Sequence, residues 1–147
     1  MIKNLLVPLD GTDLGERAMR ESIALARQFG ASIVGFVAEP ELPLPVESTN
    51  MVRYGQEIDA HAVRSDTHAH DLLAQFGALV AQAGVAFSGR HRCTDRVDEA
   101  IARAAEEIDD AMIVMITHGR GAFGGLLFGS HTKGVMSLTK VPLLVLH

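Results

Sequence analysis

Hydrophobic positions along this chain fall into two patterns that follow one another in turn. Short continuous apolar runs bounded by turn residues are typical of strands buried on both faces, whereas an apolar position at every third or fourth residue is typical of a helix packed on a sheet. The continuous runs predict five strands, at residues 2–9, 31–37, 85–92, 112–116 and 141–146.

Segments of helical period separate these runs. Glycine often follows the last residue of a helix because it adopts positive φ without steric cost, and Gly30 and Gly84 fit that role. Prolines at positions 40, 43 and 45 exclude a helix interior and predict a loop that extends to about residue 51. The period predicts four helices, at residues 13–29, at about 59–83, at 97–108 after a cap at Thr94 or Asp95, and from Ser130 onward.

Strands and helices therefore alternate strictly from end to end. This order predicts a single α/β domain over residues 1–147, with an open five-stranded parallel sheet, helices on both faces and right-handed crossovers, as in Rossmann-like folds. Such sheets bind ligands at the carboxyl ends of their strands, near the point where the strand order reverses. Asp10, Val37 and the segment after Ile116 all follow strand ends, so we expect a site there.

Composition and charge narrow the function classes. The net charge of −5 argues against general nucleic-acid binding, which needs Lys and Arg to neutralise phosphates. No apolar run reaches 18 residues, and the N-terminal segment turns acidic too soon for a signal peptide, so no membrane association is expected. The single cysteine, Cys93, excludes an internal disulfide framework and is consistent with a reducing cytoplasm.

The segment between the fourth strand and Ser130 carries the clearest candidate chemistry. It contains five glycines, at positions 119, 121, 124, 125 and 129. A helix that begins at Ser130 directs unpaired N–H groups into this segment, which favours an anion and above all a phosphate. A glycine-rich surface loop followed by a serine cap is the alternative interpretation. Residues 119–124 also match G-x-G-x-x-G, but the helix begins too late for a dinucleotide fingerprint, and no P-loop motif occurs.

A second spacing of glycines in this segment is more specific than the G-x-G-x-x-G match. Gly119, nine further residues and then Gly129-Ser130 resemble the nucleotide loop of the universal stress protein family, G-x-x-G-x(9)-G-[ST]. The resemblance covers the whole chain, from the opening strand that ends at Asp10 to the closing strand at residues 141–146. It implies a cytoplasmic homodimer that pairs through residues 141–146, in a family with an ATP-binding and a non-binding subfamily.

In the ATP-binding subfamily, the resemblance implies that Asp10 contacts the nucleoside and that the backbone at Pro8 and Val37 borders the adenine. The ribose and phosphates would be surrounded by Met115, Gly119, Gly129, Ser130, His131 and Thr132. The expected ligand is ATP, or AMP or ADP, with Mg²⁺ or Mn²⁺ held through the phosphates. No catalytic residue and no protein metal site are expected.

One position departs from the family motif. Ile116 stands where the motif has its first glycine. Its side chain narrows the pocket if it faces the ribose and costs little if it faces the core. The leading hypothesis is a dimeric, nucleotide-responsive regulatory protein of the stress response. The alternatives are a slow ATPase or phosphotransfer enzyme that uses the same pocket, and an interaction dimer that binds no nucleotide.

Histidine and cysteine give weaker signals. His61, His68 and His70 lie on one predicted helix but lack the i, i+4 spacing of a helical metal pair. Cys93 follows Arg90 and Arg92, whose positive charge would favour a thiolate. An ordinary cysteine at the end of a strand is nevertheless the preferred interpretation.

Overall fold

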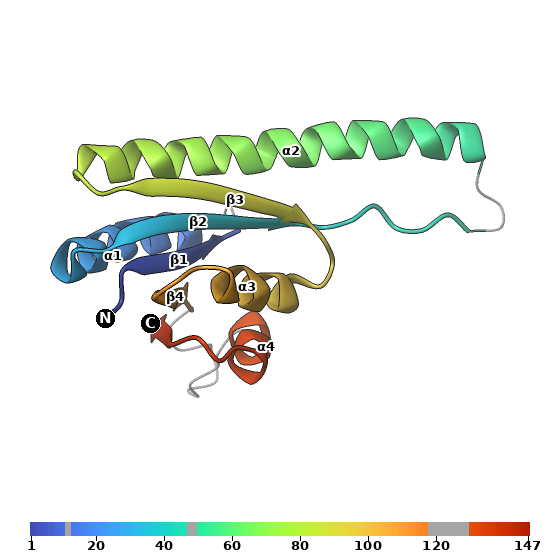
Figure 1. Cartoon of the computed structure of the whole chain (residues 1–147). Helices are drawn as coiled ribbons and strands as arrows, with labels where there is room; N and C mark the ends of the chain where they lie inside the picture. The colour runs from blue at the N-terminus through green and yellow to red at the C-terminus, as the bar shows by residue number, and fades with distance from the viewer. Residues whose placement is uncertain (11–12, 47–49, 118–129) are drawn as a thin grey trace.

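The computed structural model describes residues 1–10, 13–46, 50–117 and 130–147 (Figure 1). The predicted order of strands and helices is confirmed, as is the parallel sheet. The elements are β1 Asn4–Leu9, α1 Asp13–Phe29, β2 Ser32–Glu39, α2 Met51–Gln82, β3 Phe87–Cys93, α3 Val97–Glu106, β4 Ala111–Ile116, α4 Ser130–Leu138 and β5 Leu143–Leu146.

The five parallel strands have the order β3-β2-β1-β4-β5, so β1 lies at the centre and the strand order reverses beside it. β1 pairs with β2 from Asn4↔Ser32 to Leu9↔Val37. Its pairing with β4 is shorter and ends at Leu6↔Ile113. Beyond that pair the two strands separate towards their carboxyl ends. Pro8 lies in this stretch of β1. A proline has no N–H to donate, and a central strand tolerates it here because β1 has no paired residue in β4 beyond Leu6.

Helices cover both faces of the sheet. α1 and α2 lie on one face and α3 and α4 on the other, as Figure 1 shows for α2, α3 and α4. Successive residues of β1 point to opposite faces of the sheet. Leu5 and Val7 pack in the core beneath α1 and α2, whereas Leu6 packs in the core beneath α3 and α4. The continuous apolar runs of the sequence follow from this burial on both sides.

Helix α2 begins at Met51, earlier than the predicted start near residue 59. The side chain of Asn50 caps it and accepts hydrogen bonds from the backbone N–H groups of Val52 and Arg53, both at 3.1 Å. None of its buried residues comes before Ser65; they are Ser65, Ala69, Phe76 and Val80. The part before Ser65 extends beyond the sheet (Figure 1), so burial imposes no apolar period there and the pattern gave no signal.

Two further details of the helices differ from expectation. Thr94 and Asp95 do not cap α3, whose N-cap is Arg96. The hydroxyl of Thr94 instead accepts the N–H of Arg96 at 3.0 Å, and Asp95 accepts the N–H of Glu41. The helical period would place Phe29 and Leu79 on inward faces, but their side chains are 47% and 36% exposed because they lie near helix ends, at the margin of the core.

Cys93 does not have a cationic environment. Successive residues of a strand face opposite sides, so Arg92 points away from the thiol, which lies 3.6 Å from the carbonyl oxygen of Pro40. Partial desolvation and the carboxylates of Glu41, Asp95 and Glu39 raise the pKa of Cys93 above its ordinary value of 9.0. The structure therefore agrees with an ordinary cysteine at the end of a strand and contradicts the alternative of a favoured thiolate.

Gly35 of β2 provides a test of how closely α2 packs on the sheet. A Cβ at this position would lie 3.0 Å from Leu73 and 3.1 Å from both Phe76 and Phe87. We predict that Gly35→Ala lowers the free energy of unfolding by about 1–3 kcal/mol, because these buried side chains have little space to move. Urea denaturation measures this difference.

The matched control is Gly55→Ala, which lies in the exposed part of α2, where an added methyl group would have no atom within 4 Å. Alanine there should stabilise the helix by up to about 1 kcal/mol. Equal stability of the Gly35→Ala variant and the native protein would contradict close packing at β2.

Candidate functional site

A hollow of about 290 Å³ lies at the carboxyl ends of β1 and β4, where the two strands separate. Its walls come from both ends of the sequence and from both helix layers. The residues that line it are Pro8, Leu9, Asp10, Gly15, Ala18, Phe36, Ala38, Val97, Ile101, Met115, Ile116, Thr117, Ser130, His131 and Thr132. The hollow therefore lies where the strand order reverses, which is where open parallel sheets usually bind their ligands.

Asp10 supplies the acidic group of the hollow. It is exposed and directly follows β1. Its carboxylate lies close to the first turn of α1, since a Cβ added to Gly15 would be 3.6 Å from its Oδ1 atom. A negative charge near a helix N-terminus is stabilised by the helix dipole. Among the described residues that line the hollow, Asp10 is the one carboxylate.

The first turn of α4 forms another wall. Ser130 is exposed, whereas Thr132 is 2% exposed. The Nδ1 atom of His131 lies 2.6 Å from the Oδ1 atom of Asp98, which links α4 to α3. Gly134 permits this close contact, because a Cβ there would lie only 1.8 Å from the other oxygen of Asp98. The first turn of α4 is therefore held in place by α3.

The structure brings most of the predicted site residues together. Those lining the hollow are Pro8, Asp10, Met115, Ser130, His131 and Thr132. Gly119 and Gly129, with the rest of residues 118–129, lie outside the described part of the chain. Val37 does not line the hollow; its side chain is 1% exposed and packs beneath α1 and α2. Its neighbours Phe36 and Ala38 line it instead, because alternate residues of β2 face opposite sides.

Sequence reasoning did not assign several wall residues to the site. Val97 and Ile101 are apolar residues four positions apart in the predicted helix at 97–108, and this helical period was a usable signal that they face inward. Gly15, Ala18 and Thr117 carried none, because a small or polar residue at one position does not indicate which cavity it borders.

Ile116 lies between the core and the hollow. It is partly buried and packs against the core beneath α1 and α2, and it also lines the hollow. Ligand pockets are commonly about 300–1,000 Å³. The hollow of about 290 Å³ among the described residues is thus near the lower limit, and a branched side chain stands on its wall.

Comparison with known proteins identifies relatives of this fold. The family model described as "Universal stress protein family" matches residues 1–147. No curated protein matches the chain. Among solved structures, UspA from Lactobacillus plantarum superimposes with a TM-score of 0.75 at 20% identity, covering 99% of this chain and 97% of that one.

Two similar structures contain adenine nucleotides. A universal stress protein in complex with cAMP has a TM-score of 0.67 and 20% identity, with coverage of 99% of this chain and 97% of that chain. One from Archaeoglobus fulgidus in complex with dAMP has a TM-score of 0.61 and 19% identity, with 100% of both chains covered. At these identities the structures support the fold alone. Since the family model spans residues 1–147, however, the chain belongs to the universal stress protein family.

Proposed function

We propose that this protein binds an adenine nucleotide in the hollow between β1 and β4 and acts as a nucleotide-responsive regulatory module in the stress response. The observation that carries the proposal is the meeting of Asp10 and the first turn of α4 in one hollow at the strand carboxyl ends. The bound cAMP and dAMP of two related structures support an adenine nucleotide as the class of ligand. ATP is the first candidate, followed by ADP and AMP.

Each wall suits a different part of the ligand. Asp10 would accept hydrogen bonds from the ribose or the base, and Phe36, Ala38, Val97 and Ile101 offer an apolar surface for the ring. The backbone N–H groups and hydroxyls of Ser130 and Thr132 would hold the phosphates. Mg²⁺ or Mn²⁺ would be held mainly through the phosphates, because Asp10 is the one carboxylate among the described lining residues.

The side chains that line the hollow favour nucleotide binding over catalysis. Hydrolysis or phosphotransfer at a useful rate needs a group that positions or deprotonates the nucleophile. Asp10 already has a proposed role with the nucleoside, and His131, the other titratable side chain among the described lining residues, lies 2.6 Å from Asp98 and holds α4 against α3. We therefore propose a module that senses a nucleotide by binding it.

A homodimer and a cytoplasmic location complete the proposal. β5 is an edge strand, and its outer side can pair with a second copy of the chain across a two-fold axis. The single exposed thiol of Cys93 is compatible with a reducing compartment. Within the described residues, no helix combines the length and the apolar character needed to cross a bilayer.

ATP with Mg²⁺ should raise the thermal midpoint of the protein. A ligand of the folded state at 100 times its dissociation constant stabilises by about 2.7 kcal/mol. Asp10→Ala should weaken ATP binding roughly tenfold, because a hydrogen bond to a charged acceptor is lost. The midpoint of each variant is measured with and without nucleotide.

Asp59→Ala is the matched control, because it also removes an exposed acid but lies on α2, away from the hollow. Its midpoint should shift with ATP as far as that of the native protein. A native protein whose midpoint does not change at millimolar ATP and Mg²⁺ would refute the proposed function.

Ile116→Ala should tighten ATP binding by about three- to tenfold, which corresponds to roughly 0.7–1.4 kcal/mol, because it enlarges the hollow at its wall. The substitution should also destabilise the protein, since Ile116 packs partly against the core. Isothermal titration gives the affinity for ATP, and urea denaturation gives the stability.

The control is Ile23→Ala, at a partly buried residue of α1 that does not line the hollow. This variant should lose stability without a change in its affinity for ATP. Unchanged or weaker ATP binding by Ile116→Ala would show that the side chain does not limit the site.

The proposed dimer has a direct test. Sedimentation equilibrium should give twice the 15.8 kDa mass of the chain at micromolar concentration. Val145→Pro should shift the equilibrium towards the monomer, because successive residues of a strand face opposite sides: the carbonyl groups of Pro142 and Leu146 accept hydrogen bonds from the β4 side, so the N–H of Val145 lies on the outer edge. A native protein that remains monomeric at all concentrations would contradict pairing through this strand.

A further inference from the structure

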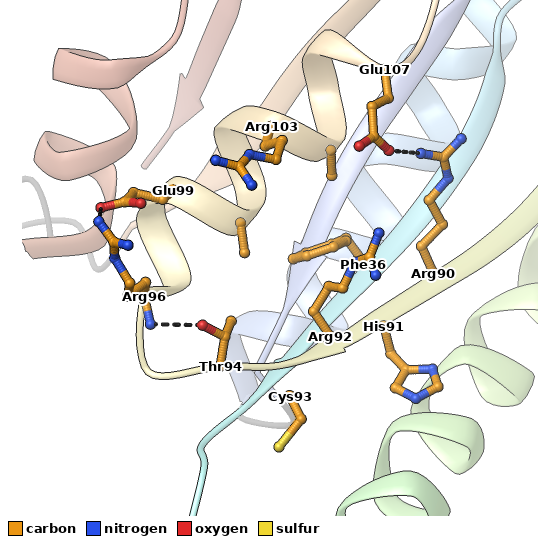
Figure 2. Close-up of a pocket in the computed structure, with 12 residues that line it drawn as sticks. Phe36, Arg90, His91, Arg92, Cys93, Thr94, Arg96, Glu99, Arg103 and Glu107 are labelled. Atoms are coloured by element: carbon orange, nitrogen blue, oxygen red, sulfur yellow. Dashed lines mark hydrogen bonds and ion pairs between the residues drawn. The ribbon is translucent and has the colours of Figure 1, made fainter.

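A second and larger hollow lies on the other side of α3, between this helix and β3 (Figure 2). Its volume is about 830 Å³. Arg90 and Arg92 come from β3, whereas Arg96 and Arg103 come from the N-cap and body of α3. We refer to this hollow as the arginine groove. Phe36 lies against both hollows, and they share no other residue of the described part of the chain.

The local structure explains why four arginines meet here. β3 is an edge strand whose residues alternate between faces, so His91 points towards α2, 3.1 Å from Asp66, while Arg90 and Arg92 point towards α3. On α3, positions 96, 100, 103 and 107 follow one stripe of the helix surface. The small side chain of Ala100 in this stripe leaves the groove open between the longer ones.

The charges in the groove do not balance. Arg90 pairs with Glu107 at 3.2 Å, and Arg96 pairs with Glu99 at 2.5 Å. Arg92 and Arg103 have no acidic partner among the described residues, and Figure 2 shows no interaction drawn to either. Two positive charges are thus left over in one concave site of a chain whose net charge is −5.

We propose that the arginine groove binds a small polyanion that carries at least two phosphate or carboxylate groups. A guanidinium group presents a planar fork of N–H donors, which binds phosphate or carboxylate oxygens in pairs. Arg92 and Arg103 approach from opposite walls, so one ligand can bridge β3 and α3. A long nucleic acid is disfavoured, because Glu99 and Glu107 border the groove and the whole chain is acidic.

The arginine groove is distinct from the proposed nucleotide site. Val97 and Ile101 line one side of α3, and Arg96, Ala100 and Arg103 line the other. The inference therefore does not depend on nucleotide binding, and each can fail without the other.

The test is isothermal titration of the full chain with sodium tripolyphosphate and, separately, with citrate, at constant ionic strength. Saturable binding of at least one probe is expected, and comparison of the two identifies the preferred anionic group. R92Q/R103Q should weaken binding of that probe at least about tenfold, because both unpaired guanidinium groups are lost. Its thermal shift with ATP should equal that of the native protein.

R64Q is the matched control, since it removes one exposed arginine from α2 on the opposite face of the sheet, and it should bind the probe like the native protein. If R92Q/R103Q does not fold, the single variants and the amide chemical shifts of the native protein during titration locate the site. Shifts should concentrate in Phe87–Cys93 and in residues 94–107, which together contain the lining residues of β3 and of α3 with its two ends. No saturable binding of either probe, an equal loss in R64Q, or shifts concentrated outside these two segments would overturn the proposal.

Discussion

The short pairing between β1 and β4 is the constraint on which the rest of the structure depends. A central strand of a parallel sheet needs a partner on each side, and β1 has β2 along its full length. With β4 it pairs only as far as Leu6 and Ile113. The carboxyl ends therefore separate, and the space between them is enclosed by the start of α1, by α3 and by the first turn of α4. Asp10 and Ser130, distant in sequence, face one hollow for this reason.

Helix α3 organises the chemistry on its face of the sheet. One stripe of its surface carries Val97 and Ile101 and is apolar towards the proposed nucleotide site. Another stripe carries Arg96 and Arg103 and is cationic towards the edge strand β3. The contact of Asp98 with His131 fixes α4 against the same helix. A ten-residue helix thus separates two environments of opposite character.

The topology could be predicted from the sequence because burial on both faces gives the strands continuous apolar runs and glycine marks helix ends such as Gly30 and Gly84. The proximity of Asp10 and Ser130 could be predicted as well, since strand carboxyl ends meet at one edge. Other features depend on tertiary packing and left no local signal. Arg92 and Cys93 are neighbours in sequence, yet the alternation of β3 gives them environments of opposite charge.

Only the C-terminal part of α2 packs on the sheet, and this affects the dynamics of the helix. With 32 residues at 1.5 Å each, the helix is about 48 Å long, roughly twice the length of β3. The half that contains Phe76 and Val80 opens only when the core opens. The half that begins at Met51 has solvent on most sides and can lose its backbone hydrogen bonds separately. Amide protons along this single helix should therefore exchange with solvent at two rates, slow beside the sheet and fast beyond it.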